Sequence, residues 1–262
     1  MAILVLVDEG RIDLDRPVLG DLADRHGWSL ADPRMRAITV RQLLAHTSGL
    51  AASLPSFFDS PMATPDQAVG QVLALPLVDE PGRSFTYANV NFVLLGRLLQ
   101  DVTGLDFATA SRRLVLDPLG LSSFATVGTA DRPAGDAHHW TRAGRNYMEL
   151  LAAAGAWIAS ASDVARLVAS IESGGVLSPT TRAAMLDPSS TGPLEGGWTY
   201  GLGVRLFPDG SYGHSGTLES SRSMALHLPD GTTVAVLVNG EVPKVTDDLI
   251  ATIDWAATTL GR

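Results

Sequence analysis

Residues 87–104 read YANVNFVLLGRLLQDVTG, a polar tripeptide followed by an apolar pattern with the period of a helix. Gly104 stands where a left-handed residue commonly ends a helix. The stretch therefore predicts an amphipathic helix that buries one face and ends at Gly104. The apolar residues that recur with helical spacing are Leu95, Leu98, Leu99 and Val102.

Two further stretches of the first 190 residues also predict helices. Residues 160–175, SASDVARLVASIESGG, predict a helix that is capped by Ser162 and ends at Gly174. Residues 1–10, MAILVLVDEG, contain an apolar run too short to span a bilayer, which takes about 20 residues. They lack the basic segment and the cleavage site of a secretory signal. We therefore expect a buried helix that ends near Gly10.

The pattern changes near residue 190. From there, short β-rich runs are separated by the turn tripeptides Pro208-Asp209-Gly210 and Pro229-Asp230-Gly231, which predicts an antiparallel meander. Residues 246–260 then carry an apolar stripe with helical spacing, so we expect a terminal helix that covers the sheet. We expect a mainly helical lobe over residues 1–190 and a sheet with its covering helix over residues 191–262, packed as one structural unit.

The composition excludes several classes of function. The 262 residues are 45% hydrophobic, so the chain can bury a sizeable core. A net charge of −9 without any basic run argues against nucleic acid and anionic lipid as partners. The absence of cysteine removes disulfides, thiol catalysis and thiolate metal sites. His138 and His139 lack the spacing of metal ligands, and we expect neither a metal nor a cofactor.

Three polar stretches are candidates for a functional site, and each also has a purely structural interpretation. In residues 86–91, TYANVN, Asn89 can cap the following helix while Tyr87 packs beside it. In residues 212–220, YGHSGTLES, the polar residues can form the exposed side of a strand. In residues 38–50, ITVRQLLAHTSGL, a helix can simply run into a glycine turn. No single stretch decides between the two interpretations.

The order and spacing of the stretches resemble those of the penicillin-recognising serine hydrolases. This family comprises class C type β-lactamases, D-alanyl-D-alanine carboxypeptidases and related esterases. The resemblance covers nearly the whole chain and includes VRQLLAHTSGL, YAN followed by FVLLGRLLQDVTG, PLGL, SASDVARL, VLSP and GHSGT. It implies an α+β fold of the β-lactamase/transpeptidase type, in which a helical lobe packs on an antiparallel sheet with a C-terminal covering helix. The first strands of that sheet have no counterpart in this sequence.

The second motif of the family, Y-x-N, matches Tyr87-Ala88-Asn89. By this resemblance Tyr87 is the catalytic base that takes the proton of a serine hydroxyl, a poor nucleophile without such help. Asn89 would hold the family's lysine or the amide of the substrate, since its side chain both donates and accepts hydrogen bonds.

The third motif, K-T-G or H-x-G on a strand, matches His214-Ser215-Gly216. His214 stands where many members have lysine and is the third catalytic candidate. The resemblance assigns substrate binding to Ser215, Gly216 and Thr217: the two hydroxyls would bind a carboxylate, and the glycine would admit the substrate backbone. The N–H of Thr217 would stabilise the oxyanion.

The first motif of the family, S-x-x-K, is absent. Lys244 is the only lysine, and Glu241 stands three residues before it. In the family, the stretch LVDEGRIDLD (residues 6–15) forms the second half and exit of the helix whose first turn bears the serine. We therefore expect residue 1 to lie inside that helix and the nucleophile to lie upstream. Ser48, Ser84 and Ser215 lie near family motifs, but none has a recognisable base at a known spacing.

Two functions remain open. The first is a serine hydrolase that transfers the acyl group of a β-lactam, a D-Ala peptide or a small ester to water; its chain is truncated here and inactive for want of the nucleophile. The second is a non-catalytic homologue that binds a peptidoglycan-like or β-lactam-like ligand. Either has a small molecule or peptide as its partner. As written, the sequence predicts a cytoplasmic protein, whereas a longer chain could be exported.

Overall fold

The computed structural model describes residues 1–52, 64–131, 134–135, 146–194, 197–218 and 221–239. Its α-helices are α1 (Ala2–Asp8), α2 (Leu19–His26), α3 (Val40–Leu44), α4 (Pro65–Leu73), α5 (Asn89–Thr103), α6 (Phe107–Ser111), α7 (Tyr147–Leu151), α8 (Ala161–Ser173) and α9 (Pro179–Met185). Short 3₁₀ segments are η1 (Pro33–Ala37), η4 (Ala152–Ala154) and η5 (Pro188–Ser190), and η3 (Arg112–Leu116) is a π-helical turn. The strands are β1 (Ala125–Thr126), β2 (Trp157–Ile158), β3 (Thr199–Tyr200), β4 (Arg205–Leu206), β5 (Tyr212–Leu218), β6 (Ser221–His227) and β7 (Thr233–Asn239).

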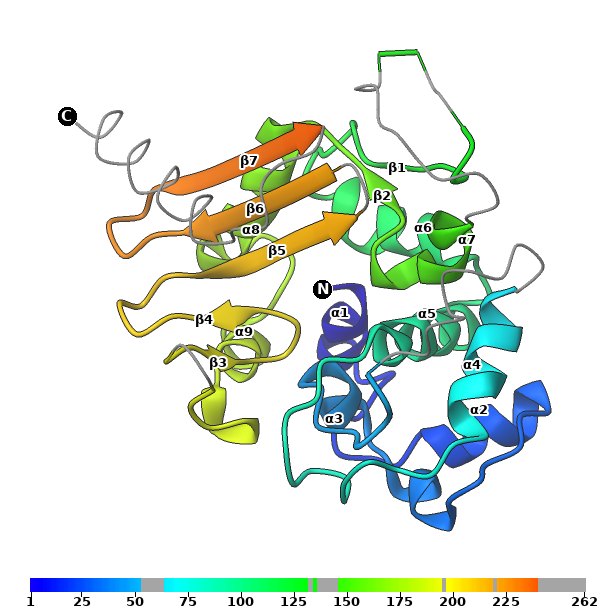
Figure 1. Cartoon of the computed structure of the whole chain (residues 1–262). Helices are drawn as coiled ribbons and strands as arrows, with labels where there is room; N and C mark the ends of the chain where they lie inside the picture. The colour runs from blue at the N-terminus through cyan, green and yellow to red at the C-terminus, as the bar shows by residue number, and fades with distance from the viewer. Residues whose placement is uncertain (53–63, 132–133, 136–145, 195–196, 219–220, 240–262) are drawn as a thin grey trace.

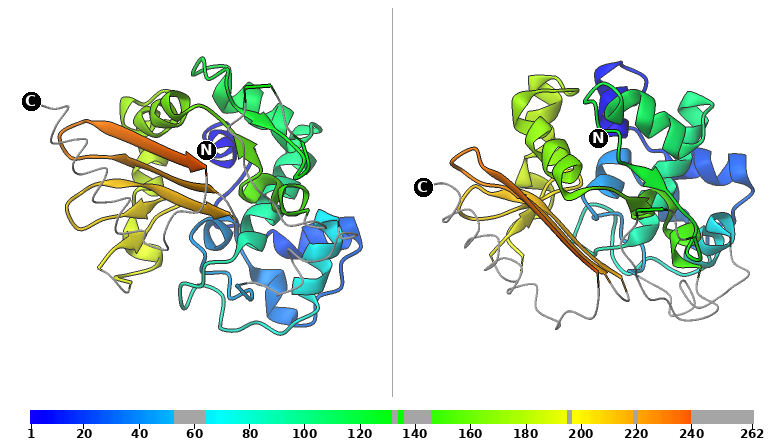
Figure 2. Two further views of the ribbon diagram at one scale, coloured as in Figure 1. Left: turned by 45° about the horizontal axis from the view of Figure 1, so that its top comes forward. Right: turned by 90° about the horizontal axis from the view of Figure 1, so that it is seen from above.

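The main sheet is the predicted antiparallel meander. Its five strands follow the chain in the order β3-β4-β5-β6-β7. Helix α8 packs against β6 and β7 on one face, α9 lies near β3 and β4 in Figure 1, and α2 to α5 form a helical part to one side of the sheet (Figures 1 and 2). The strands β1 and β2 form a separate antiparallel pair that was not predicted, because two-residue strands are too short to show an alternating pattern. This combination of helices and antiparallel sheets confirms the α+β fold.

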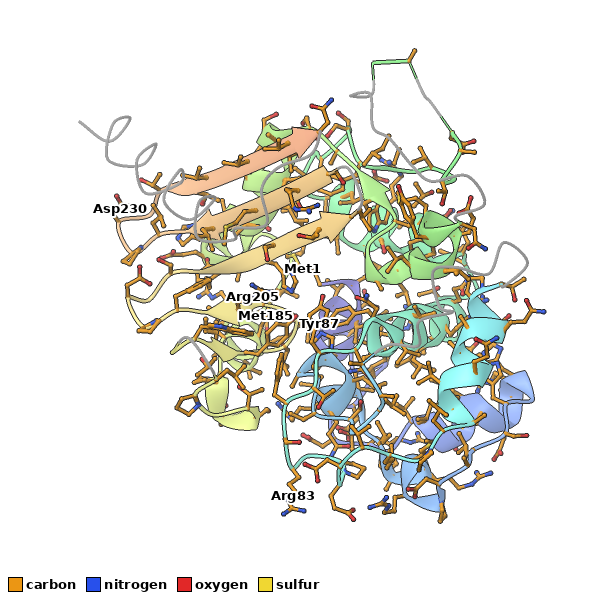
Figure 3. The ribbon with its side chains drawn as sticks, in the orientation of Figure 1. Met1, Arg83, Tyr87, Met185, Arg205 and Asp230 are labelled. Atoms are coloured by element: carbon orange, nitrogen blue, oxygen red, sulfur yellow. The ribbon has the colours of Figure 1, made fainter. Side chains whose placement is uncertain are left out.

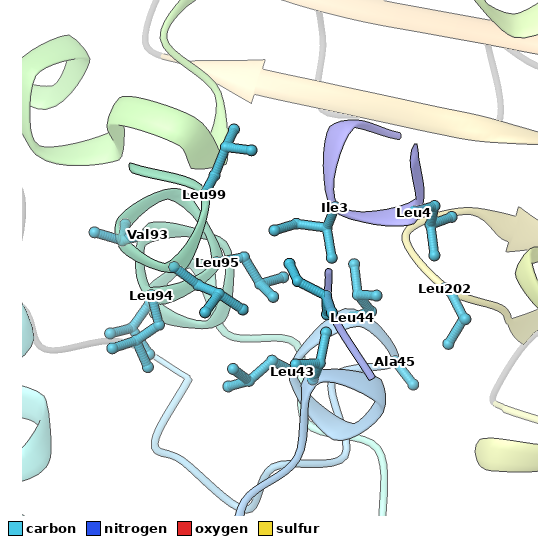
Figure 4. Close-up of a cluster of buried hydrophobic side chains, with 14 of the residues drawn as sticks. Ile3, Leu4, Leu43, Leu44, Ala45, Val93, Leu94, Leu95, Leu99 and Leu202 are labelled. Carbon is cyan, nitrogen blue, oxygen red and sulfur yellow. The ribbon is translucent and has the colours of Figure 1, made fainter. Parts of the chain in front are cut away.

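Helix α5 forms where the pattern of residues 87–104 predicts it. It ends at Gly104, which adopts a left-handed conformation with φ of 71°. Its apolar face meets α1, α3 and the loop between β3 and β4 in one buried cluster (Figure 4). The labelled members of that cluster include Ile3, Leu4, Leu43, Leu44, Leu95, Leu99 and Leu202.

The apolar run at the start of the chain lies in helix α1. Four successive residues, Ile3 to Leu6, are buried, and Gly10 has a φ of 67° just beyond the helix. The helix contacts both α5 and α9, and in each view it lies between the sheet and the helical part of the molecule (Figures 1 and 2). The prediction of a buried helix ending near Gly10 is thus confirmed.

The predicted cap of α8 was wrong by two residues. Ser160, not Ser162, precedes the helix, and its hydroxyl accepts a hydrogen bond from the Asp163 amide. This side chain can satisfy the free amide three residues ahead, whereas Ser162 already lies in the first turn. The predicted end at Gly174 is correct, with φ of 73°. The terminal helix predicted over residues 246–260 lies outside the described residues.

Asp8 joins α1 to α9 and provides a test of this packing. Its carboxylate accepts hydrogen bonds from the Ser178 amide at 2.8 Å and from the hydroxyls of Ser178 and Thr181 at 2.5 Å. We expect Asp8→Ala to lower the free energy of unfolding by about 1–2 kcal/mol, since hydrogen bonds to a charged group are lost together. Urea denaturation measures the effect. The matched control is Glu9→Ala, which removes an exposed ion pair with Arg11 and should cost about 0.5 kcal/mol or less.

Candidate functional site

Tyr87 lies between the helical part and the sheet, directly before α5. Tyr87 is 38% exposed. The ring centroid lies 4.2 Å from that of His46, 6.0 Å from that of His214 and 6.4 Å from that of Tyr200. The structure therefore brings together the tyrosine of the second predicted motif and the histidine of the third.

Asn89 is the first residue of α5, and Ala88 occupies the cap position. The structural interpretation of Asn89 as a helix cap is therefore wrong. The residue is half-buried, and its side-chain amide forms no hydrogen bond with any residue that the structure describes. The amide is free to bind a ligand or another part of the site.

The strand β5 presents an open edge next to Tyr87. Strand β4 pairs with β5 at Tyr212 and Gly213 alone, because β4 is only two residues long. Beyond Gly213, no described strand pairs with β5 on that side. Backbone N–H and C=O groups at such an edge can pair with an extended ligand.

The residues of the third motif alternate between the two faces of the sheet. His214 and Gly216 pair with Ala225 and Ser223 of β6 and share the face of Tyr212, which belongs to the main core. Ser215 pairs with Met224, a member of a separate cluster on the opposite face, and Thr217 follows the same alternation. The hydroxyls of Ser215 and Thr217 thus start on one face of the sheet, opposite the His214 ring.

A glycine at position 216 is explained by packing within the sheet, in addition to the predicted approach of the substrate backbone. A Cβ atom at this position would lie 2.6 Å from the hydroxyl oxygen of Ser223 on the neighbouring strand. A side chain here would therefore displace Ser223 before it met any substrate.

The His214 imidazole is neutral, and both of its ring nitrogens form hydrogen bonds. Its Nδ1 lies 2.7 Å from the Ser215 carbonyl oxygen, so Nδ1 carries the proton and donates it. Its Nε2 then accepts a hydrogen bond from the Tyr200 hydroxyl at 3.0 Å. Burial, together with the nearby positive charge of Arg205, lowers the pKa of His214 to about 4. At neutral pH this residue supplies no positive charge.

Tyr200 and Arg205 belong to the site although the sequence analysis did not select them. Tyr200 is 1% exposed, and burial raises the pKa of its phenol. The Arg205 guanidinium lies 4.9 Å from the ring centroid of Trp198, and its buried Nε has no hydrogen-bond partner among the described residues. Its charge favours the ionised form of both Tyr87 and Tyr200 (Figure 3). A candidate signal for Tyr200 is the pair of aromatic residues Trp198 and Tyr200 at the start of the β-rich region.

The three serines near the motifs have other hydrogen-bond partners or lie away from a base. Ser48 is buried and donates to Asn91 Oδ1 at 2.8 Å. Ser84 donates to the Asp79 carboxylate at 2.5 Å, and this hydrogen bond lowers the pKa of Asp79, which makes it a poor base. Ser215 lies on the opposite face of the sheet from His214. Among the residues that the structure describes, none of the three has the partner that activates a serine nucleophile.

Two kinds of feature are absent from the part of the chain that the structure describes. Within the described residues, no group of three or more His, Cys, Asp or Glu side chains is arranged to hold a metal ion. Within the same residues, no helix is long and apolar enough to cross a membrane.

The chain is similar in sequence and fold to several known proteins. Among solved structures, a D-stereospecific amidohydrolase from Streptomyces sp. has a TM-score of 0.81 at 26% identity, over 100% of this chain and 83% of that one. Penicillin-binding protein 4 from Amycolatopsis lactamdurans is 27% identical over 282 residues, or 92% of this chain and 69% of that protein. Protein flp from Staphylococcus aureus (strain N315) is 29% identical over 141 residues, which are 52% of this chain but only 28% of that protein.

The family model described as Beta-lactamase matches residues 1–258. The match covers nearly the whole chain and confirms the resemblance that the motifs predicted. This chain therefore belongs to the beta-lactamase family.

Proposed function

We propose that this chain forms two walls of the acyl-transfer site of a serine hydrolase that cleaves an amide or ester bond. The substrate classes are a β-lactam, a D-Ala peptide or a small ester. The observation that carries the proposal is the approach of Tyr87 to His214, with their ring centroids 6.0 Å apart. If the Y-x-N motif were only a helix cap and the H-x-G motif only an exposed strand, Tyr87 and His214 would have no reason to lie close together.

Tyr87 would transfer the proton of the nucleophile. Burial raises the pKa of its phenol, although the charge of Arg205 acts in the opposite direction. A neutral phenol can accept the serine proton only as it gives its own proton to a second base. A lysine at the site, as in the family's S-x-x-K motif, would supply that base. We thus propose that Tyr87 relays the proton from the serine to the lysine. The positive charge of Arg205 would favour this transfer, because it stabilises the ionised phenol.

The serine and lysine of this relay are proposed to lie upstream of residue 1. The sequence contains no S-x-x-K, and no described residue serves as an activating base for Ser48, Ser84 or Ser215. Helix α1 lies between the sheet and α5, where the family's nucleophile helix belongs. In the family, the serine stands about eight residues before the position of Met1. We call the 262 residues together with their in-frame upstream residues the completed chain.

The open edge of β5 would bind the reacting carbonyl group. The Thr217 amide is the candidate for one of two oxyanion donors, and the amide of the serine would be the other. This assignment uses the backbone of Thr217 and does not require its hydroxyl, which starts on the opposite face of the sheet.

Arg205 is the proposed binding group for a substrate carboxylate. His214 is neutral and its two ring nitrogens are engaged, so it cannot supply the charge. Arg205 acts electrostatically on Tyr87 and has a buried Nε without a described partner. Guanidinium groups bind carboxylates strongly and with defined geometry. The proposal therefore favours substrates that carry a carboxylate, with Asn89 available for their amide.

Covalent labelling tests the proposed function. We expect a fluorescent penicillin or a fluorophosphonate to label the completed chain and to leave the 262-residue chain unlabelled. In-gel fluorescence after denaturation measures the adduct. The proposal fails if the completed chain, folded by circular dichroism, takes up neither label, or if its upstream frame encodes no S-x-x-K.

The absent S-x-x-K motif also favours a second candidate function, a non-catalytic homologue that binds a β-lactam-like or peptidoglycan-like ligand. This candidate predicts reversible binding of a penicillin to the 262-residue chain with no adduct in either chain. Equilibrium dialysis combined with mass spectrometry separates the two, because a hydrolase forms an acyl-enzyme and a binding protein does not.

A further inference from the structure

His46 lies beneath Tyr87 in a conformation that few residues adopt. It follows α3 with a φ of 56°, one of two positive values among the described residues other than glycine. Its side chain is fully buried. Histidine and asparagine tolerate this left-handed region better than most residues, although each still incurs a cost. The backbone here turns the imidazole into the interior.

His46 binds the amide groups on both sides of Tyr87. The Thr86 amide donates to the His46 carbonyl oxygen at 2.8 Å, and the Ala88 amide donates to His46 Nδ1 at 3.2 Å. The imidazole also packs on the phenol ring, with centroids 4.2 Å apart. The Tyr87 hydroxyl has no hydrogen bond to any described residue, so these contacts, and not its own hydroxyl, hold the side chain in place.

A second donor fixes the protonation state of His46. The Asn91 side-chain amide lies 3.0 Å from Nδ1, and its oxygen accepts a hydrogen bond from Ser48, so the NH₂ group faces the imidazole. With two donors directed at it, Nδ1 must be unprotonated and Nε2 must carry the hydrogen. Nε2 is buried without a hydrogen-bond partner among the described residues. The rings of Phe85, Phe92 and Tyr200 surround the imidazole at 5.2–5.9 Å.

We infer that His46 is a positioning residue for Tyr87: its carbonyl oxygen and its unprotonated Nδ1 hold the two amides that flank the tyrosine. The inference rests on the proposed function only in so far as Tyr87 takes part in catalysis. If Nδ1 were protonated, it would become a donor. Its N–H would then face the Ala88 amide and the Asn91 NH₂ group, which are donors themselves, and both hydrogen bonds would be lost. Burial and the neighbouring His214 lower the pKa of His46 to about 3, so the acceptor persists at neutral pH.

The first test measures the tautomer of the unaltered 262-residue chain. Imidazole ¹⁵N NMR, from about pH 5 to pH 8, should show a non-titrating histidine with an unprotonated Nδ1 and a protonated Nε2. His214 should not titrate over this range either, but it carries the proton on Nδ1 and is thereby distinguished. The signals that disappear in His46→Asn assign it. A protonated Nδ1, or a titration of His46 within that range, would overturn the inference.

The second test compares two variants that both tolerate the left-handed backbone. His46→Asn keeps an acceptor oxygen close to the place of Nδ1, whereas His46→Gly removes the acceptor. The readout is the ionisation midpoint of Tyr87 in chains with ¹³C-labelled tyrosine, assigned by Tyr87→Phe. The charged or titratable groups near Tyr87, namely Arg205, His214 and Tyr200, are the same in both variants.

We expect His46→Asn to keep the raised midpoint of Tyr87 and His46→Gly to let it fall toward the ordinary tyrosine value, because a released ring turns to solvent. Equal midpoints in the two variants would overturn the inference. If His46→Gly does not fold, the tautomer measurement decides alone. Neither readout depends on turnover, so failure of the inference is distinguishable from failure of the proposed function, which labelling of the completed chain measures.

Discussion

Tyr87→Phe in the completed chain should reduce the acylation rate by about 10²–10⁴-fold, the usual contribution of a proton-transfer group. The phenylalanine ring preserves the packing on His46 and removes only the hydroxyl. Binding of the substrate before acylation should change little, since the proposed relay acts on the nucleophile. Stopped-flow measurement with a chromogenic β-lactam or ester separates the two steps.

The matched control is Tyr212→Phe. Tyr212 lies in β5, the strand that also carries His214, and its hydroxyl is buried without a hydrogen-bond partner among the described residues. This variant should retain the acylation rate. A Tyr87→Phe variant that acylates as fast as the control would exclude Tyr87 as the proton relay.

Arg205→Gln should lower kcat/KM for carboxylate-bearing substrates by about 10–100-fold, the loss expected when a charge-assisted hydrogen bond is removed. The same substrate with its carboxylate esterified should lose little, because it offers no charge to the guanidinium. The neutral state of His214 makes this contrast sharp, since His214 cannot replace the missing cation.

Arg113→Gln is the control for net charge. Arg113 is exposed in the π-helical turn η3, away from the sheet, and its removal changes the total charge by the same amount. It should leave both substrates unaffected. Equal losses for the free and the esterified substrate in Arg205→Gln would show that Arg205 stabilises the site without binding the carboxylate.

The elements with strong periodicity could be predicted from the sequence. Helix α5 and the strands β5 to β7 follow the apolar spacing and the turn tripeptides, because each signal lies within one short segment. Local chemistry was less decisive at the start of α8, where two serines compete as caps and geometry selects Ser160. The strands β1 and β2 form only by pairing with each other, and each is too short to show an alternating pattern of apolar residues in the sequence.

The candidate site could be predicted in part. Tyr87 and His214 were found because they belong to motifs, and the structure brings them together. Tyr200 and Arg205 were missed because their importance depends on His214 and Tyr87, which are distant in sequence. His46 stands in a stretch that was interpreted as a helix ending at a glycine turn. Its contacts with Thr86 and Ala88 arise only when that turn packs under the second motif.

The faces of β5 show a further limit of motif reasoning. A motif places Ser215 and Thr217 beside His214 along the chain, whereas a strand turns successive side chains to opposite faces. The backbone of these residues still lies on the open edge next to the site. For this reason the proposed oxyanion donor is the Thr217 amide. Arg205 is proposed for the carboxylate on separate grounds, namely its charge near Tyr87 and His214 and its buried Nε without a described partner.

In the proposed site, Tyr87 and the β5 edge act on a serine from an upstream S-x-x-K motif. The most direct measurement is peptide mapping by mass spectrometry of the completed chain after reaction with a penicillin. We predict a single acyl adduct on the S-x-x-K serine and none on the 262-residue chain treated in parallel. An adduct on Ser48, Ser84 or Ser215 in either chain would contradict the account.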